Sequence, residues 1–147
     1  NKELDQYTYF GVGPHESMPD RAIGRVGKYS STVEKQLTDY IKPQECGGHI
    51  GVRWFEISDS PAGGLAKNAR GIRIELDKPR MVTVLPVTSE ALADATHNIY
   101  VKRSGTTVVT IDAIHRGVGT ASCGPDTLDQ YKIKPGTYKF TWTLTKL

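Results

Sequence analysis

Long apolar runs are missing from this sequence of 147 residues. No stretch approaches the roughly 20 apolar residues that a membrane helix needs, so we expect no membrane-spanning segment. A signal peptide and an initial methionine are missing too, and NKELDQYTYFG passes almost at once into a strand pattern. We therefore expect a piece of a longer polypeptide, whose targeting is not readable from these residues.

Basic stripes and cysteine-rich patterns are also missing. The net charge is +3, but the lysines and arginines are scattered without interleaved aromatic residues, so nucleic-acid binding is not expected. Only two cysteines occur, Cys46 and Cys123, each in a glycine-rich turn. A disulfide framework in a domain of this size normally uses more cysteines. We predict two free thiols.

The common motifs of phosphate, metal and serine-nucleophile chemistry do not occur. The stretch GVGTASCG (117–124) lacks a Walker lysine, and Ser122 is not in a G-x-S-x-G turn. The histidines lack the spacing of metal ligands; they are His15, His49, His97 and His115. We predict no cofactor or metal site in this chain. One alternative stays open, a nucleophilic Cys123 activated by His115.

Alternation of apolar and polar residues is abundant, and it indicates β-strands. In TYKFTWTL (137–144) alternate residues are apolar, and in IGVRWFEI (50–57) the phase shifts, which predicts a β-bulge. We expect Trp54 and Trp142 to pack in the core. TTVVTIDAI (106–114) is apolar on both faces and is expected to be a central strand.

Helix signals are few. TSEALADATH (88–97) begins with a cap-like threonine or serine followed by acidic residues, which predicts a short helix. A second short helix is expected over 31–37, where Ser31 and Glu34 have the spacing of a capping box. The segment NIYVKR (98–103) fits a strand. Many short strands with frequent turns predict an all-β chain, an antiparallel β-sandwich.

Two stretches resemble a known family. YFGVGPHESMPDR (9–21) and YIKPQECGG (40–48) are similar to paired signatures in the last domain of the large β-galactosidases of glycoside hydrolase family 2. Those signatures run roughly W-x-G-x-G-P-x-E-x-Y-x-D-R and P-Y-x-x-P-Q-E-N-G. The matching positions are Gly11, Gly13, Pro14, Glu16, Asp20 and Arg21 in the first, and Tyr40, Pro43, Gln44, Glu45 and Gly47 in the second. The resemblance covers essentially the whole chain.

The resemblance implies a place for this chain in a larger enzyme. Residues 1–147 would be one β-sandwich domain, the C-terminal part of the family's last domain, a two-layer supersandwich of the galactose-mutarotase-like kind. The full enzyme would hydrolyse terminal non-reducing β-D-galactose residues with retention, from substrates such as lactose. A preceding TIM barrel would hold both catalytic carboxylic acids and the Mg²⁺ and Na⁺ ligands. This chain would then carry no catalytic residue, and alone it is expected to be inactive.

The implied partners are the rest of the β-galactosidase chain and, through the full enzyme, a β-galactoside. Assembly into a homo-oligomer stays open, as does the compartment, the cytoplasm or the periplasm of a bacterium. Two rival interpretations belong to other classes of protein. One is a free-standing carbohydrate-binding module, and the other is a purely structural or oligomerisation domain.

The glycine-rich stretch departs from the family pattern. The family loop reads roughly G-x-G-G-D-x-S-W-G-P, and its tryptophan forms an apolar platform for the sugar in the active site. Here GVGTASCGP is one residue shorter, with a cysteine where the tryptophan would stand, and a cysteine lacks the area of such a platform. The resemblance makes Thr120, Ser122, Cys123 and His115 candidates for the rim of the sugar site. The alternative is a plain connector between two strands.

Four charged residues in the matched motifs are candidates for loop structure or for contact with the barrel. They are Glu16, Asp20, Arg21 and Glu45. A local ion pair, or a carboxylate that clamps the backbone, would hold the long loops in place. Because both motifs occur together in the family, we expect the two loops to pack against each other.

Overall fold

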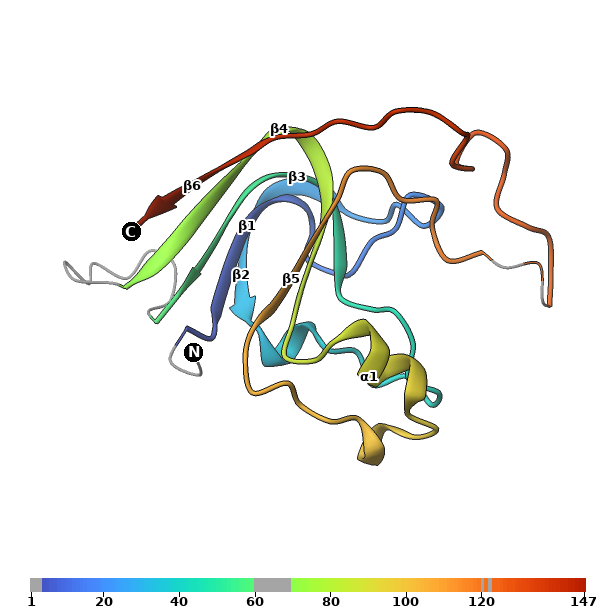
Figure 1. Ribbon diagram of the computed structural model, residues 1–147, viewed down its shortest axis with the longest axis horizontal. Coiled ribbons are helices and arrows are strands. Elements are labelled where there is room, and N and C mark those ends of the chain that lie inside the picture. The colour runs from blue at the N-terminus through green and yellow to red at the C-terminus, as the bar shows by residue number, and fades with distance from the viewer. Residues whose placement is uncertain (1–3, 60–69, 120, 122) are drawn as a thin grey trace.

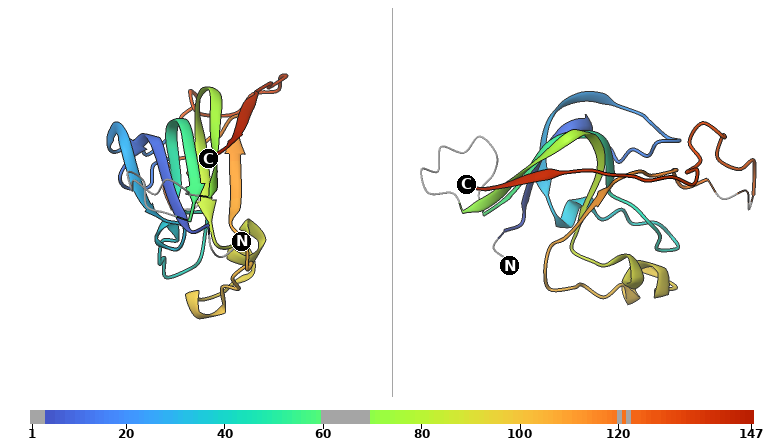
Figure 2. Two further views of the ribbon diagram at one scale, coloured as in Figure 1. Left: turned by 90° about the vertical axis from the view of Figure 1, so that its left-hand side faces the viewer. Right: turned by 45° about the horizontal axis from the view of Figure 1, so that its top comes forward.

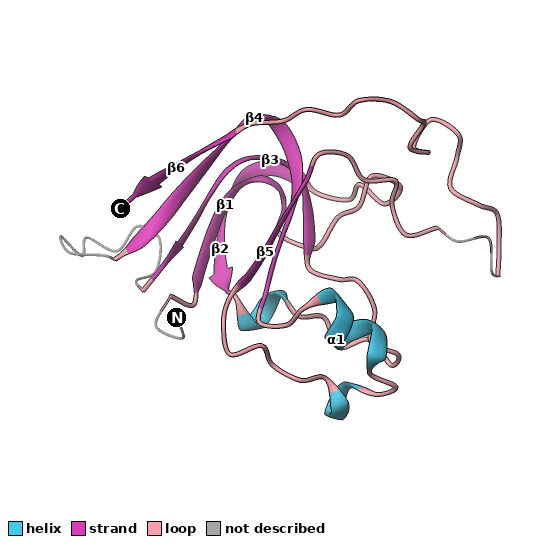
Figure 3. Ribbon diagram, viewed as in Figure 1, coloured by secondary structure: helices cyan, strands magenta, loops and turns pink. Residues whose placement is uncertain are grey.

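The computed structural model describes residues 4–59, 70–119, 121 and 123–147. The strands are β1 (Gln6–Gly13), β2 (Arg25–Thr32), β3 (Gly48–Ser58), β4 (Gly71–Leu85), β5 (Val108–Asp112) and β6 (Trp142–Lys146). The helices are short: α1 (Ser89–Asp94) and the 3₁₀ turns η1 (Glu34–Gln36) and η2 (Asn98–Tyr100). The prediction of an all-β, antiparallel fold is confirmed (Figures 1 and 3).

The described strands form one antiparallel sheet in the order β2-β1-β3-β4-β5, with β6 also beside β4. Strand β4 spans 15 residues, so its first half pairs with β6 and its second half pairs with β5. It ends at Leu85, directly before Pro86, which cannot donate to a ladder. The sheet is strongly curved, and α1 lies on the inner side of the curve (Figure 2).

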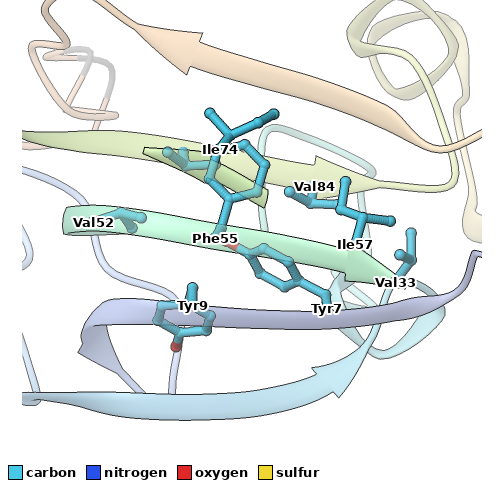
Figure 4. Close-up of a cluster of buried hydrophobic side chains, with 9 residues drawn as sticks. Tyr7, Tyr9, Val33, Val52, Phe55, Ile57, Ile74 and Val84 are labelled. Atoms are coloured by element: carbon cyan, nitrogen blue, oxygen red, sulfur yellow. The ribbon is translucent and has the colours of Figure 1, made fainter. Parts of the chain in front are cut away.

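One face of the sheet carries the core (Figure 4). Tyr7 and Tyr9 are two residues apart on β1, so they share a face, and they pair with Ile57 and Phe55 on β3. The main cluster comprises Tyr7, Tyr9, Val33, Val52, Phe55, Ile57, Ile74, Val82 and Val84. Register shifts on either side of Val52 confirm the predicted bulge in β3. The alternation in residues 50–57, with its shift of phase, therefore placed Val52, Phe55 and Ile57 correctly.

The expectation for the two tryptophans was wrong. Trp54 lies outside the core, stacked on Phe10 with ring centroids 6.2 Å apart and with the Arg73 guanidinium 4.0 Å from its ring. Trp142 is 49% exposed and Leu144 is 51% exposed. Both lie on β6, which pairs only with β4 among the described strands, and every residue of β6 is exposed.

Three strand expectations were also wrong in part. Of residues 137–144 only the last three lie in a strand, β6. Residues Val108–Asp112 do form a strand, but β5 is at the edge of the described sheet and not at its centre, because it pairs only with β4. Segment 98–103 forms the turn η2 and an extended stretch, and of its apolar residues only Val101 packs on a cluster, that of Leu85 and Leu92. A pattern of three apolar residues is too short to separate a strand from such a connection.

The predicted short helices are present. Thr88 caps α1 by accepting a hydrogen bond from the backbone N–H of Ala91 at 3.2 Å. The second helix is the single turn η1, and the capping box from Ser31 to Glu34 does not form, because Val33 occupies the cap position. None of the described helices is long and apolar enough to span a membrane. Both predicted free thiols are confirmed, with Cys46 buried and Cys123 exposed.

Candidate functional site

Three loops meet at one end of the sheet (Figure 1). The first loop (residues 14–24) joins β1 to β2, and the second loop (residues 37–47) joins η1 to β3. The glycine-rich loop (residues 113–125) follows β5. The matched motifs therefore lie beside the glycine-rich loop, although up to 99 positions separate hydrogen-bonded partners.

Glu16 is the centre of the contact between the first and second loops. Its carboxylate accepts hydrogen bonds from the side chains of Arg21 and Tyr40, from the backbone N–H of Gly47 at 2.8 Å and from the Thr38 hydroxyl at 3.3 Å. Burial alone would raise the pKa of Glu16, but the donors outweigh burial and lower it. Glu16 is therefore an ionised, hydrogen-bonded clamp between two loops.

Asp20 holds the backbone of the glycine-rich loop. Its Oδ2 accepts hydrogen bonds from the N–H groups of Val118 at 3.1 Å and Gly119 at 3.0 Å. Successive backbone N–H groups that converge on an anion form a nest, the arrangement with which many loops bind phosphate. Here the anion is a carboxylate of the same chain. Gly117 has a φ of +93°, and a Cβ there would overlap the Asp20 carboxyl group, so the position requires glycine.

His115 links the second loop to the glycine-rich loop. Its Nε2 lies 2.9 Å from Oε1 of Glu45, and its Nδ1 accepts a hydrogen bond from the backbone N–H of Gly117 at 2.8 Å. The hydrogen bond to Glu45 raises the pKa of His115, and the same contact lowers the pKa of Glu45. Because both ring nitrogens are engaged, neither is left to activate a thiol. The alternative of a Cys123–His115 nucleophile therefore has no support.

The far side of the glycine-rich loop is held by residues within the loop and directly after it. The carbonyl oxygen of Gly119 accepts hydrogen bonds from Arg116 at 3.1 Å and from the Thr127 hydroxyl at 3.0 Å. Arg116 also forms an ion pair with Asp126. Cys123 is exposed beyond these contacts, and the candidates Thr120 and Ser122 lie outside the described residues. Arg116, Asp126 and Thr127 were missed by the sequence reasoning, because a spacing of ten residues within a loop carries no recognisable pattern.

The structure brings together Glu16 with Arg21, Asp20 with the glycine-rich loop, and Glu45 with His115. Tyr40 was part of the matched motif but was not singled out, although its hydroxyl reaches Glu16. Among the described residues, no group of three or more His, Cys, Asp or Glu side chains is placed to share a metal ion. In this arrangement the side chains of Glu16, Asp20 and His115 accept hydrogen bonds from backbone N–H groups and so fix the path of the loops.

Comparison with known proteins decides the family. The family described as "Beta galactosidase small chain" matches residues 1–144 of the chain. The chain belongs to the β-galactosidase small-chain family. All three loops fall inside the match.

Curated relatives are β-galactosidases. The chain is 30% identical to the enzyme of Actinobacillus pleuropneumoniae over 92% of its own length, 32% identical to that of Arthrobacter sp. (strain B7) over 90%, and 36% identical to that of Lactobacillus delbrueckii subsp. bulgaricus over 91%. It spans only 12–13% of the length of these relatives. This member of the small-chain family therefore corresponds to a small domain of a much larger enzyme.

Proposed function

We propose that this chain is an accessory β-domain of a longer β-galactosidase, the C-terminal part of its last domain. The full enzyme hydrolyses terminal non-reducing β-D-galactose residues with retention of configuration. The observation that carries the proposal is the family match over residues 1–144, in a chain that spans 12–13% of its relatives. The catalytic carboxylic acids, and any Mg²⁺ and Na⁺ ligands, belong to the rest of that polypeptide.

The domain presents the glycine-rich loop to the rim of the sugar site. Thr120, Ser122, Cys123 and His115 are the residues assigned to this rim. The support is the concentration of polar contacts on the base of the loop, where Asp20 and His115 hold three successive backbone N–H groups. A plain connector would not need a carboxylate from another loop, that of Asp20, to fix its backbone.

The local carboxylates serve structure in this proposal. Retaining glycosidases need one carboxylic acid that donates a proton and one free nucleophile, about 5 Å apart. Glu16 accepts hydrogen bonds from four groups, Asp20 accepts two from backbone, and Glu45 faces His115. Each carboxylate has a partner within the loops, which suits clamping and not bond cleavage.

The exposed side chains of β6 fit a domain that is covered by the rest of the polypeptide. Trp142 and Leu144 stand on one strand, and Leu147 follows at 41% exposure. Aliphatic neighbours disfavour a sugar platform, which would rely on aromatic rings and polar groups. This favours an accessory domain over a free-standing carbohydrate-binding module.

Deletion of residues 120–123 in the full enzyme tests the assignment of the rim. The proposal expects a higher KM or a lower kcat for a chromogenic β-galactoside, with the thermal unfolding temperature unchanged, because a surface loop contributes little to the core. Unchanged kinetic constants in a properly folded deletion variant would reduce the loop to a connector and the domain to structural support.

A further inference from the structure

We infer that His115 is a positioning residue for the glycine-rich loop and that it acts as the neutral ring with its proton on Nε2. Protonation of Nδ1 then releases the backbone N–H of Gly117 at the start of the loop. This inference rests on the proposed function for its effect on catalysis, but its structural part stands on the contacts of His115 alone. The ring is largely enclosed, with a side-chain exposure of 13%.

The contacts fix which nitrogen carries the proton. A backbone N–H is a donor only, so Nδ1 must accept from Gly117 through its lone pair. Nε2 faces a carboxylate oxygen of Glu45, which only accepts when it is ionised, so the proton lies on Nε2. The neutral Nε2–H ring satisfies both neighbours at once.

The protonated ring satisfies only one of them. A proton on Nδ1 would point at the N–H of Gly117, which places two donors against each other, so this hydrogen bond must break. The contact between Nε2 and Glu45 survives and becomes an ion pair. Protonation of His115 therefore changes the position of the loop. The ring stays bound to Glu45 of the second loop, and its hydrogen bond to Gly117 is lost.

The surroundings of His115 favour this titration. Three carboxylates from three elements face it: Glu45 from the second loop, Asp112 from the end of β5 and Asp20 from the first loop. Their negative charges favour the protonated ring. Three cationic residues also lie near His115. Lys78 and Arg80 line the same hollow of about 400 Å³ as His115. Arg80 forms an ion pair with Asp77 at 2.8 Å and donates to the carbonyl oxygen of Ala113 at 2.6 Å, and Arg116 forms an ion pair with Asp126.

The two halves of the imidazole can be replaced one at a time. Asparagine places a side-chain oxygen near the position of Nδ1, so His115→Asn keeps an acceptor for Gly117 and cannot be protonated. Glutamine places its amide near the position of Nε2, so His115→Gln keeps a donor toward Glu45 and loses the acceptor. His97→Asn is the matched control, because His97 is exposed and lies beyond α1.

Hydrogen exchange of the loop, followed by mass spectrometry on the full enzyme, tests the structural part. Wild type and variants are compared at the same pH, which cancels the intrinsic pH dependence of exchange. As the pH falls through the titration of His115, the peptide that contains residues 117–119 should lose the protection of its Gly117 amide in wild type and in His97→Asn, while Asp20 continues to protect the amides of Val118 and Gly119. In His115→Asn protection should persist, and in His115→Gln it should be low at every pH. Equal protection in wild type and His115→Asn at all pH values would overturn the inference.

The kinetic part is measured on the same proteins. The KM for a chromogenic β-galactoside should rise in wild type on acidification by roughly two- to tenfold, the equivalent of one net hydrogen bond. In His115→Asn this rise should be absent. If exchange follows His115 but the KM does not, the positioning role holds and the proposed place of the loop at the sugar rim fails. If exchange does not follow His115, the positioning role itself fails.

Discussion

The carboxylate of Glu16 is held by donors from its own loop and from the second loop. Glu16 accepts hydrogen bonds from four groups and joins the first and second loops. A glutamate at this position was predictable from the matched motif, and an ion pair with Arg21 was one of the expected roles. Its bond to Tyr40 was not predictable, because 24 positions separate the two residues and only the fold brings them together.

Glu16→Gln should destabilise the chain at neutral pH by about 1.5–3 kcal/mol, the usual value of hydrogen bonds to a charged group. The folded-state pKa of Glu16 is lowered. Its contribution is therefore fully present above the unfolded-state pKa and is lost as the pH falls through the folded-state pKa. Urea denaturation across the acidic range would show the difference between wild type and variant shrinking with falling pH. A difference independent of pH would contradict this role of the charge.

Cys123→Ala should change kcat/KM of the full enzyme by less than about tenfold, or roughly 1.4 kcal/mol of transition-state binding. The reason is that a cysteine offers little surface to a sugar, in contrast with the tryptophan of the family pattern. Cys123→Trp should lower kcat/KM further, because the loop is one residue short for orienting a large ring. An alanine variant with a loss well above tenfold would give the thiol a larger role than this.

At the level of elements, the glycine-rich loop is shaped by what it binds within the chain. The sequence showed that GVGTASCG is not a Walker loop, and the structure shows that its Gly-Val-Gly start is nonetheless an anion-binding nest, occupied by Asp20. The buried part of β3 was predictable from alternation because a half-buried strand repeats every two residues, whereas β2 carries no such pattern and was not predicted. The edge position of β5 and the exposure of Trp142 were not predictable, because the sequence of a strand does not reveal which neighbouring strands it lacks.

Gly117→Ala and Asp20→Ala should be strongly non-additive. A Cβ at residue 117 would displace the Asp20 carboxylate, so each single variant breaks the same pair of hydrogen bonds. A double-mutant cycle on the free energy of unfolding should therefore give a double variant that is less destabilised than the sum of the singles. Part of the cost of Gly117→Ala persists without Asp20, because φ is +93°. Simple additivity would show that the nest and the glycine are independent.

At the level of the whole molecule, the chain is a curved sheet with a well-formed core on one face and an uncovered strand at β6. The family resemblance predicted that the chain is a piece of a larger enzyme. The comparisons support this prediction, because the chain matches the family over residues 1–144 but spans only a small share of the length of each relative. The geometry of the loops could not be derived from the motifs, since the partner atoms are set only by folding.

The isolated chain should show no turnover of a chromogenic β-galactoside. Its loop carboxylates are engaged with donors of the same chain, and the reaction needs a free pair. Purified chain, prepared in a host without its own β-galactosidase, is the sample to measure. Sustained hydrolysis by that sample would place the catalytic pair inside these residues.

The most direct test of the account is the kcat/KM of the full enzyme carrying Asp20→Ala, beside the matched control Asp129→Asn. Asp129 is exposed and pairs only locally with Lys132 at 2.9 Å, whereas Asp20 holds the backbone of Val118 and Gly119. We expect kcat/KM to fall roughly tenfold or more in Asp20→Ala, the equivalent of losing hydrogen bonds to a charged acceptor, and to stay unchanged in Asp129→Asn. In both enzymes the rest of the polypeptide should retain its wild-type unfolding temperature. Equal kcat/KM in Asp20→Ala and wild type would contradict the claim that this domain presents its loop to the sugar site.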